Sequence, residues 1–258
     1  MTINTTGYTV GSNRPLNHAR ILWNMITGTV TGDGTNPALA ANDFTAQRWT
    51  VNAGSWVLQT AADAQVDCVF IAAHNLAGKL VTIGTSAATT GGFTTRTSFT
   101  PPDNTTICAL FNTAGGLPHT IRRIQVTVAG TNNAVGIIRA GVALQMQQPF
   151  YAGHGVANWS RITEGQQQFS ETGQWLGRTE KRIALEASYS WAHLDASWYR
   201  TNFEPFARTL PLKPFGIAGN PSKMPDDVAW AWTSADPRPT NMGIRDLVQV
   251  GMTVTGYR

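Results

Sequence analysis

The pattern of apolar and polar residues is clearest between Asp43 and Leu76, the stretch DFTAQRWTVNAGSWVLQTAADAQVDCVFIAAHNL. It contains two hydrophobic runs, and a polar joint at Thr60–Asp63 separates them. The second run, Val66–Ala73, is almost continuously apolar and is rich in β-branched and aromatic side chains. Such a run is typical of a strand buried on both faces. The pattern therefore predicts a turn at the joint and a central strand after it.

The rest of the first half has the pattern of short strands separated by turns. In Ile121–Val128 apolar and polar residues alternate, which indicates an antiparallel strand with one buried face. Residues 1–20 are polar and interrupted by Gly and Pro, which favours an extended arm or an edge strand. We expect one helical turn at Ala38–Ala41 and further strands at Leu80–Gly84, Ile107–Phe111 and around Val142, Leu144 and Met146. This pattern predicts a β-sandwich over residues 1–148.

The second half has a different pattern, and we place a boundary near Pro149–Gly155. Alternation predicts a strand at Glu180–Ser190. The spacing of Leu194, Trp198 and Phe203 predicts a helix over Leu194–Phe203, which Pro205 should kink or end. The proline-rich stretch Leu210–Pro225 is expected to be a loop. Two more alternating strands are predicted at Val228–Trp232 and Val248–Val254. Residues 149–258 are therefore predicted to form a smaller β-sheet that carries one helix.

Composition and charge narrow the functional classes. Only 13% of the residues are charged, and the net charge of +4 comes from 19 basic and 15 acidic residues without a basic run. Nucleic-acid binding needs a clustered basic surface, so no nucleic-acid specificity is predicted. No apolar segment approaches the ~20 residues that a membrane span needs, and no signal peptide is visible. Cys68 and Cys108 lie in apolar runs, which favours buried thiols, although a disulfide stays open.

No catalytic or metal-binding motif is present. The chain has no nucleophile elbow, phosphate-binding loop, HExxH helix or CxxC pair, and its five histidines are scattered. The pair Asp226–Asp227 is expected to start a strand or to face solvent. We therefore predict no enzyme activity, no cofactor and no metal site. The nine tryptophans are compatible with sugar-stacking platforms, but core and interface packing is the more common use of such rings.

Two stretches resemble known families. The segments DFTAQRW and VDCVFIAAHNL resemble the galactose-binding-like jelly rolls of the discoidin type, over about the first 145 residues, although that family's cysteine pair at the domain ends is absent. The second half, with LDASWYRTNF on its helix, is similar in plan to tail-tube, distal-tail and baseplate proteins of tailed bacteriophages. Those proteins assemble as rings of β-sandwiches with a helix packed on the side.

These resemblances imply two functional hypotheses. The first is a structural subunit of a phage virion, made in the host cytoplasm, which forms a homo-oligomeric ring and docks other tail or baseplate proteins. The expected interface residues are Trp198, Tyr199, Trp230 and Trp232. The alternative is a carbohydrate-binding module that contacts a host-surface glycan. Its expected ligand edge is formed by Asp33, Asn42, Arg48, Trp49 and Arg96.

Overall fold

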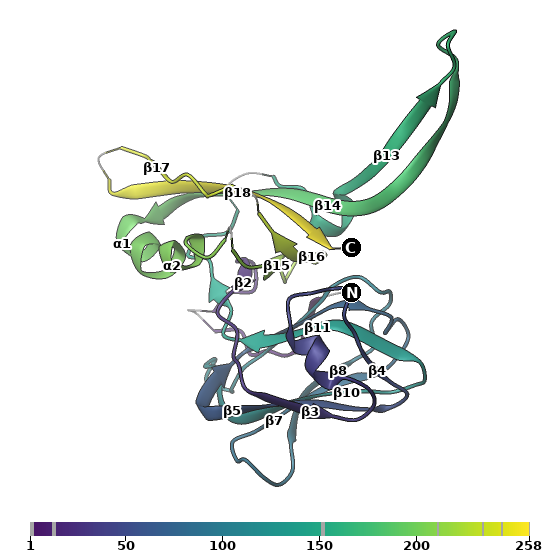
Figure 1. The fold of residues 1–258 in the computed structure, drawn as a ribbon. Helices are drawn as coiled ribbons and strands as arrows, with labels where there is room; N and C mark the ends of the chain where they lie inside the picture. Colours follow the sequence, from purple (N-terminus) through teal and green to yellow (C-terminus); the bar gives the residue numbers. More distant parts are fainter. Residues whose placement is uncertain are drawn as a thin grey trace.

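The computed structural model describes residues 3–11, 14–150, 153–210, 212–233, 235–243 and 245–257. The protein is mainly β, as the sequence predicts. Its strands form three sheets stacked as layers, and a short helical segment packs against the third sheet (Figure 1). Among the helices of the described residues, none is long and apolar enough to span a membrane.

Two five-stranded sheets form the β-sandwich predicted for the first half. The first sheet has the order β1 (Ile3–Gly7), β9 (Ile107–Phe111), β6 (Cys68–His74), β11 (Asn133–Gly141), β4 (Trp49–Val51). The second sheet has the order β3 (Thr29–Gly32), β5 (Gly54–Val66), β10 (His119–Val128), β7 (Val81–Ser86), β8 (Thr94–Phe99). The helical turn predicted at Ala38–Ala41 is the 3-10 helix η1 (Pro37–Ala41). The edge strand expected at the start of the chain is β1.

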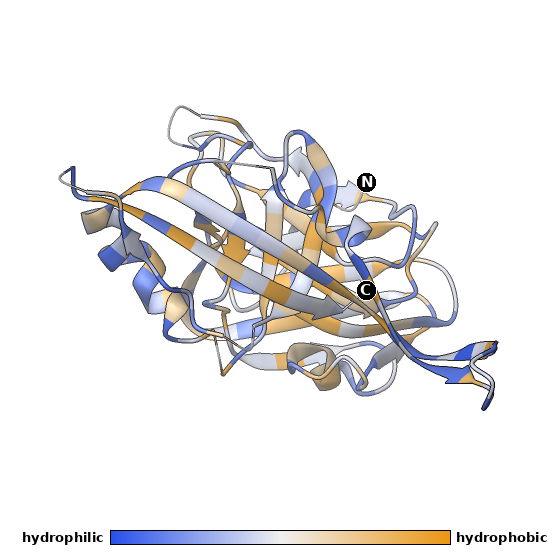
Figure 2. Cartoon of the chain, turned by 90° about the horizontal axis from the view of Figure 1, so that it is seen from above, coloured by the Kyte–Doolittle hydropathy of each residue, from blue (hydrophilic) through white to orange (hydrophobic). Residues whose placement is uncertain are grey.

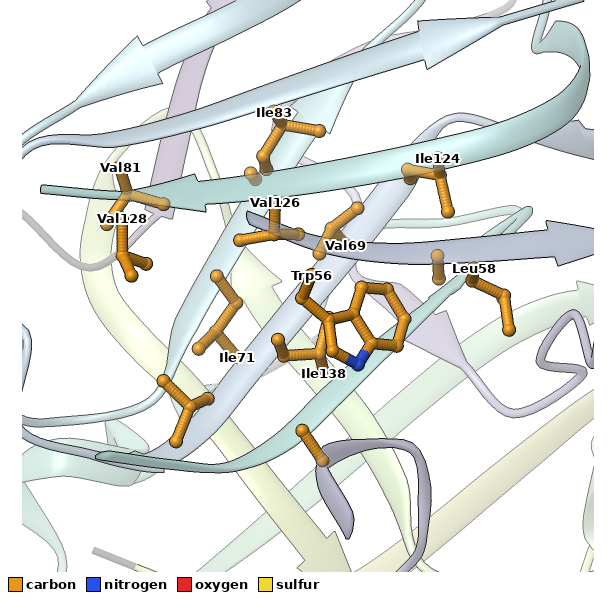
Figure 3. Packing of buried hydrophobic residues seen from close by; sticks show 14 of the residues in the cluster. Trp56, Leu58, Val69, Ile71, Val81, Ile83, Ile124, Val126, Val128 and Ile138 are labelled. Carbon is orange, nitrogen blue, oxygen red and sulfur yellow. The ribbon is translucent and has the colours of Figure 1, made fainter. Parts of the chain in front are cut away.

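The sandwich core lies between these two sheets. Trp56 and Leu58 of β5 face Ile71 of β6 and Ile138 of β11, and all four side chains are almost fully buried (Figure 3). The alternation predicted for β10 is confirmed, because Ile124, Val126 and Val128 lie in this core while the residues between them are partly exposed. Each such apolar side chain contributes roughly 1.5–3 kcal/mol when it is fully buried.

Strand β6 is buried on both faces, as its continuous apolar sequence predicts. Val69 and Ile71 lie in the sandwich core. Cys68, Phe70 and Ala72 point to the opposite face, where they meet the third sheet. With β9 on one side and β11 on the other, β6 is also the middle strand of its sheet.

The turn predicted at Thr60–Asp63 is wrong, because β5 continues through it to Val66. Gln59 pairs with Arg123 and Ala64 with Ile121, so the four residues between them lie opposite Arg122 alone in a special bulge. The Thr60 hydroxyl donates to the Arg122 carbonyl at 3.1 Å, and the Arg122 guanidinium donates to the Ala61 carbonyl at 3.0 Å. The chain turns at Asp67 instead and crosses there to the first sheet.

The last strand of the sandwich is β11, and its sequence NAVGIIRAG did not suggest it. Both faces of β11 are largely buried, so its sequence lacks the alternation that marks a half-exposed strand. The strand predicted around Val142, Leu144 and Met146 is only the two-residue β12 (Leu144–Gln145). That strand pairs in the third sheet and not in the sandwich.

The third sheet combines strands from both ends of the sequence. Its order is β12, β2 (Arg20–Leu22), β15 (Phe215–Asn220), β16 (Met224–Trp232), β18 (Leu247–Tyr257), β14 (Trp175–Asp195), β13 (Arg161–Phe169), and β17 (Thr240–Asn241) pairs with β18. The alternating strands predicted in the second half correspond to β14, β16 and β18. Because β2 comes from the first half, the division into domains 1–148 and 149–258 stays a prediction.

Strand β15 lies inside the stretch Leu210–Pro225, so the prediction of a loop there is wrong. The prolines flank the strand at Pro214 and Pro221, and the residues between them are almost all buried. Gly216 is required by packing, because a Cβ at this position would lie 2.5 Å from the ring of Phe70 in β6. A glycine that admits a close neighbour weakens the strand pattern in the sequence.

The helical segment begins later and ends later than predicted. It contains α1 (Ala196–Trp198), the π-helix η3 (Tyr199–Phe203) and α2 (Glu204–Ala207). A separate 3-10 helix, η2 (Ala157–Trp159), lies earlier in the chain. Asp195 caps the start of the helical segment, because the carboxylate accepts from the amides of Ser197 and Trp198. Pro205 does not end the helix. It occupies the first turn of α2, where a missing amide hydrogen is tolerated.

Two further hydrophobic clusters join the layers. The junction cluster packs Phe70, Leu110 and Ile137 of the first sheet against Val228 and Trp230 of the third. The outer cluster lies on the other face of the third sheet. It contains Phe203 and Phe206 of the helical segment.

Candidate functional site

The predicted ligand edge is only partly assembled in the structure. Asp33 follows β3, and its carboxylate accepts from the Ser55 amide at 2.8 Å. Its carbonyl accepts from the indole nitrogen of Trp49 at 2.7 Å. Trp49 is fully buried in the sandwich core, so its ring has no face for a sugar. Arg48 beside it is exposed.

Asn42 and Arg96 do not complete such an edge. The Asn42 side chain is occupied locally, since it accepts from the Phe44 amide at 2.8 Å and donates to Gln47 at 2.5 Å. Arg96 lies on β8, and Asp33 follows β3 at the opposite edge of the second sheet. The Arg96 guanidinium donates to the Thr85 hydroxyl at 2.6 Å, and burial lowers the pKa of Arg96.

A polar hollow of about 460 Å³ lies beside this edge. Thr35, Thr50, Asn52 and Asn132 line it, and no aromatic residue is among the described residues of its wall. It therefore offers hydrogen-bonding groups without a ring on which a sugar could stack. Thr35 lies between β3 and η1 and Thr50 lies in β4, while Asn52 follows β4 and Asn132 precedes β11.

The four predicted interface residues differ in how much of each side chain is exposed to solvent. Trp230 is 1% exposed and lies in the junction cluster, and Tyr199 is buried in the outer cluster. These two rings therefore stabilise the chain itself and offer little surface to another subunit. Trp232 at the end of β16 is 38% exposed, and Trp198 is half-buried. An interface role stays a prediction for Trp198 and Trp232.

Trp198 lines a cavity of about 550 Å³ between the helical segment and the first half of the chain, which we call the junction cavity. Trp23, which follows β2, lines the same cavity. The sequence did not indicate that these two rings line one cavity, because they are 175 positions apart in the chain. Only the pairing of β2 within the third sheet brings Trp23 to the helical segment.

A β-hairpin extends from the third sheet, and we call it the arm. It consists of β13, a turn, and residues 175–184 of β14, and it projects away from the body of the molecule (Figure 1). Along its length it is mostly hydrophilic (Figure 2). Near the turn, however, Phe169, Trp175 and Leu176 are 57%, 65% and 64% exposed.

Among the described residues, no strand pairs with either outer edge of the arm. Strand β13 is the last strand of the third sheet, and β14 pairs with β18 only from Leu185 onward. In residues 161–183, all of which the structure describes, no side chain is buried. Two ion pairs join its strands. Arg182 donates to both oxygens of Glu164 at 2.6 and 2.7 Å, and the Arg161 guanidinium lies 3.8 Å from the Glu180 carboxylate. Such exposed pairs contribute little stability.

A buried polar cluster surrounds Asp227, which the sequence did not suggest. The pair Asp226–Asp227 does lie near the start of β16, but Asp227 does not face solvent and is fully buried. Its carboxylate accepts from Tyr189 at 3.1 Å and from the Ala157 amide at 3.0 Å, and it lies 2.6 Å from the His154 ring. The signal was available in principle, because Asp227 shares its strand face with two buried alanines.

The hydrogen bonds of the Asp227 cluster hold neighbouring segments of the chain together. Burial raises the pKa of Tyr189 well above its usual value, and the neighbouring Asp227 carboxylate adds to that effect. A neutral tyrosine therefore donates a stable hydrogen bond to Asp227 and helps to hold η2 against the third sheet. Among the described residues, no group of three or more His, Cys, Asp or Glu is placed to hold a metal ion.

The two cysteines lie next to each other in the first sheet. Their sulfur atoms are 3.7 Å apart, and both thiols are free and fully buried. Burial raises the pKa of Cys68 well above its usual value. This is the buried-thiol arrangement that the sequence favours.

No protein-family model and no curated protein matches the chain. Among solved structures, a pectin-binding carbohydrate-binding module is 18% identical and covers 45% of this chain and 91% of its own, with a TM-score of 0.37. The family 32 module of NanJ from C. perfringens, solved with galactose, is 12% identical with 43% and 91% coverage and the same TM-score. A GH29 fucosidase from Ruminococcus gnavus matches over 46% of this chain and 25% of its own, at 13% identity and a TM-score of 0.39. At these values the likeness says nothing about the ligand or activity of this chain.

Proposed function

We propose that this protein is a non-catalytic structural subunit of a larger protein assembly, which it joins through the arm. One observation carries the proposal. The arm is a long two-stranded hairpin with both edges free, and it presents Phe169, Trp175 and Leu176 to solvent near its turn. An isolated two-stranded hairpin is at best marginally stable in water. A partner that covers the arm supplies the missing stability.

The free edges indicate how a partner is held. Unpaired strand edges carry rows of amide and carbonyl groups that pair readily with another strand. The apolar side chains near the turn add buried apolar surface, which backbone pairing alone does not provide. Aromatic side chains of this kind contribute much of the binding energy at protein interfaces. The hydrophilic length of the arm keeps the free subunit soluble until it is covered.

The specific assembly that we propose is the tail or baseplate of a tailed bacteriophage. There the protein forms a homo-oligomeric ring and docks neighbouring tail proteins within the virion. The support for this is the resemblance in plan that the sequence of the second half, with LDASWYRTNF on its helix, has to ring-forming tail proteins, together with a charged fraction of only 13%. A surface poor in charge suits a subunit whose neighbours cover it.

The test is to replace Phe169, Trp175 and Leu176 together by serine in the full chain. We expect the triple variant to stay monomeric in light scattering and to be excluded from particles, because its anchor residues are gone. Its circular dichroism and unfolding midpoint should not change, since no buried side chain is altered. The matched control is Trp159→Ser, which removes an exposed tryptophan outside the arm.

The result for the unaltered protein decides the proposal. If it stays monomeric at high concentration and joins no particle with its genomic neighbours, the assembly function is wrong. If the triple variant assembles as well as the unaltered chain, assembly does not proceed through the arm.

Binding of a host-surface glycan is the second candidate function. The predicted ligand edge supports it poorly, since Trp49 is buried and Arg96 lies at the other edge of the sheet. The junction cavity supports it better, because two tryptophan rings and several amide side chains line one hollow.

A further inference from the structure

The junction cavity combines elements from three parts of the chain. Trp23 and Asn24 follow β2, Gln145 belongs to β12, and Thr201 and Asn202 belong to the helical segment. Its volume of about 550 Å³ lies within the range of roughly 300–1,000 Å³ that small-molecule sites occupy. The cavity is therefore large enough for a ligand.

The two tryptophan rings are held in place by packing on the side away from the cavity. The Trp23 ring lies 6.2 Å from the ring of Phe206, and both Trp23 and Trp198 pack against the outer cluster. Both remain half-buried, so part of each ring is accessible at the cavity wall. A rigid aromatic face suits the apolar C–H face of a pyranose ring, because it buries that area at little cost in conformational entropy.

The polar residues of the wall match the hydroxyl groups of a sugar. Amide and hydroxyl side chains both donate and accept hydrogen bonds, as sugar hydroxyls do. Two of them are held by the helix backbone. The Asn202 amide donates to the Trp198 carbonyl at 3.0 Å, and the Thr201 hydroxyl donates to the Ser197 carbonyl at 3.0 Å.

The charge of the cavity favours a neutral ligand. Arg14 is the one charged residue among the described residues of the wall, and it donates to the buried carboxylate of Asp67 at 2.8 Å. That pairing offsets the positive charge of Arg14, so little attraction remains for an anionic group. No carboxylate lines the wall in the described part of the chain to repel one or to bind a cation.

We propose that the junction cavity binds a neutral hexopyranose unit of a glycan, with Trp23 and Trp198 against its ring and Asn24, Thr201 and Asn202 at its hydroxyls. The proposal rests on the second candidate function and gives it a site and a ligand class. It places glycan binding between the helical segment and the two segments that connect the sandwich to the third sheet, away from the predicted edge at Asp33 and Arg48.

The experiment measures binding of the full chain to methyl glucoside, methyl galactoside, methyl mannoside and their uronic acid counterparts by calorimetry. Asn24→Ala and Trp198→Ala are the test variants, and Trp198→Phe is the conservative one. We expect the alanine variants to weaken binding of a neutral sugar about tenfold or more, which corresponds to ~1.4 kcal/mol. Trp198→Phe should retain most of the affinity, and the neutral sugar should bind better than its uronic acid.

The matched control is Trp159→Ala, which should bind like the unaltered chain. Asn24 is exposed, so its variant tests the cavity even if Trp198→Ala fails to fold. If glycans bind and both test variants bind normally, the cavity is not the site while glycan binding stands. If no neutral sugar binds the unaltered protein at millimolar concentration, both the cavity proposal and the second candidate function are wrong. Preference for uronic acids would overturn the ligand class.

Discussion

Asp67 holds three segments together at the point where the chain crosses from the second sheet to the first. Its carboxylate accepts from Arg14 and from the Ala143 amide, both at 2.8 Å. Its own amide donates to the Gly141 carbonyl, and its carbonyl accepts from the Phe111 amide. Burial raises the pKa of Asp67, and the hydrogen bonds to it act in the opposite direction. One residue therefore fixes the ends of three strands and the segment before β2.

His74 makes stability depend on pH. Burial lowers the pKa of His74 to about 4, and its ring is neutral while it accepts from the Leu76 amide and donates to the Thr105 carbonyl. The unfolded chain binds a proton below pH ~6.5 that the folded protein does not bind. Stability should therefore fall by about 3 kcal/mol as the pH drops from 6.5 to 4.

The measurement is urea unfolding of the unaltered chain and of His74→Gln at pH 7 and pH 4. Glutamine does not titrate, so this variant should lose about 3 kcal/mol less over that interval, although it is less stable at pH 7. The control His193→Gln alters an exposed histidine and should follow the unaltered chain. Equal losses for His74→Gln and the unaltered chain would contradict the assignment.

At the scale of elements, the strands differ in how many of their faces and edges are covered. Strand β6 is covered on both faces and both edges, whereas the arm half of β14 is covered on one edge only. Local opening follows such differences, because segments with few buried contacts open at low free energy. One strand of 21 residues thus contains both stable and easily opened parts.

This contrast predicts the pattern of amide hydrogen exchange. In the monomer, amides from Gln166 to Arg178 should exchange faster than those of any other strand, and those of Tyr189 and Trp191 should be among the slowest. In the assembled state the arm should become protected, because a partner then pairs with its edges. Exchange followed by mass spectrometry on both states gives the comparison. An arm that is already as well protected as β18 in the monomer would be at odds with its free edges.

At the scale of the whole molecule, the sandwich depends on the third sheet. Phe70, Leu110 and Ile137 lie on the face of the first sheet that the third sheet covers. Strand β2 has its neighbours β15 and β12 there, and not in the sandwich. The layers therefore share one continuous interior across the predicted domain boundary.

A fragment of residues 1–148 tests this dependence. We expect it to aggregate or to unfold at a much lower temperature than the full chain, because the apolar face of its first sheet is exposed to water. Adding Phe70→Ser and Leu110→Ser to the fragment should improve its solubility, while the same changes should destabilise the full chain. Soluble yield and thermal unfolding provide the readout. A stable, soluble 1–148 fragment would support two independent domains instead.

The sequence predicted the strands in which each face has the same degree of burial along most of its length. β10, β14 and β18 alternate because one face is more exposed, and β6 is apolar throughout because both faces are covered. It did not predict β15, whose glycine makes room for Phe70 and whose flanking prolines indicate a loop. Phe70 and Gly216 are 146 positions apart in the chain, so the residues around Gly216 give no sign of this contact.

The candidate sites were harder to predict than the strands. A tryptophan near a loop suggested a ligand edge, but Trp49 points into the sandwich core. The rings of Trp23 and Trp198 came together only through the pairing of β2 with β15. The arm was missed because its sequence has the polar character of a surface strand, and only the free edges distinguish it.

The continuity of β14 has a mechanical consequence. The strand runs from the tip of the arm at Trp175 to Asp195, and from Leu185 onward it lies antiparallel to β18. A pull along the part of β14 that pairs with β18 therefore acts parallel to that ladder. Its hydrogen bonds are loaded together in shear and do not open one after another. A partner that pulls on the tip therefore works against the β14–β18 ladder of the third sheet. We expect the contact between the partner and the arm to break before that ladder does.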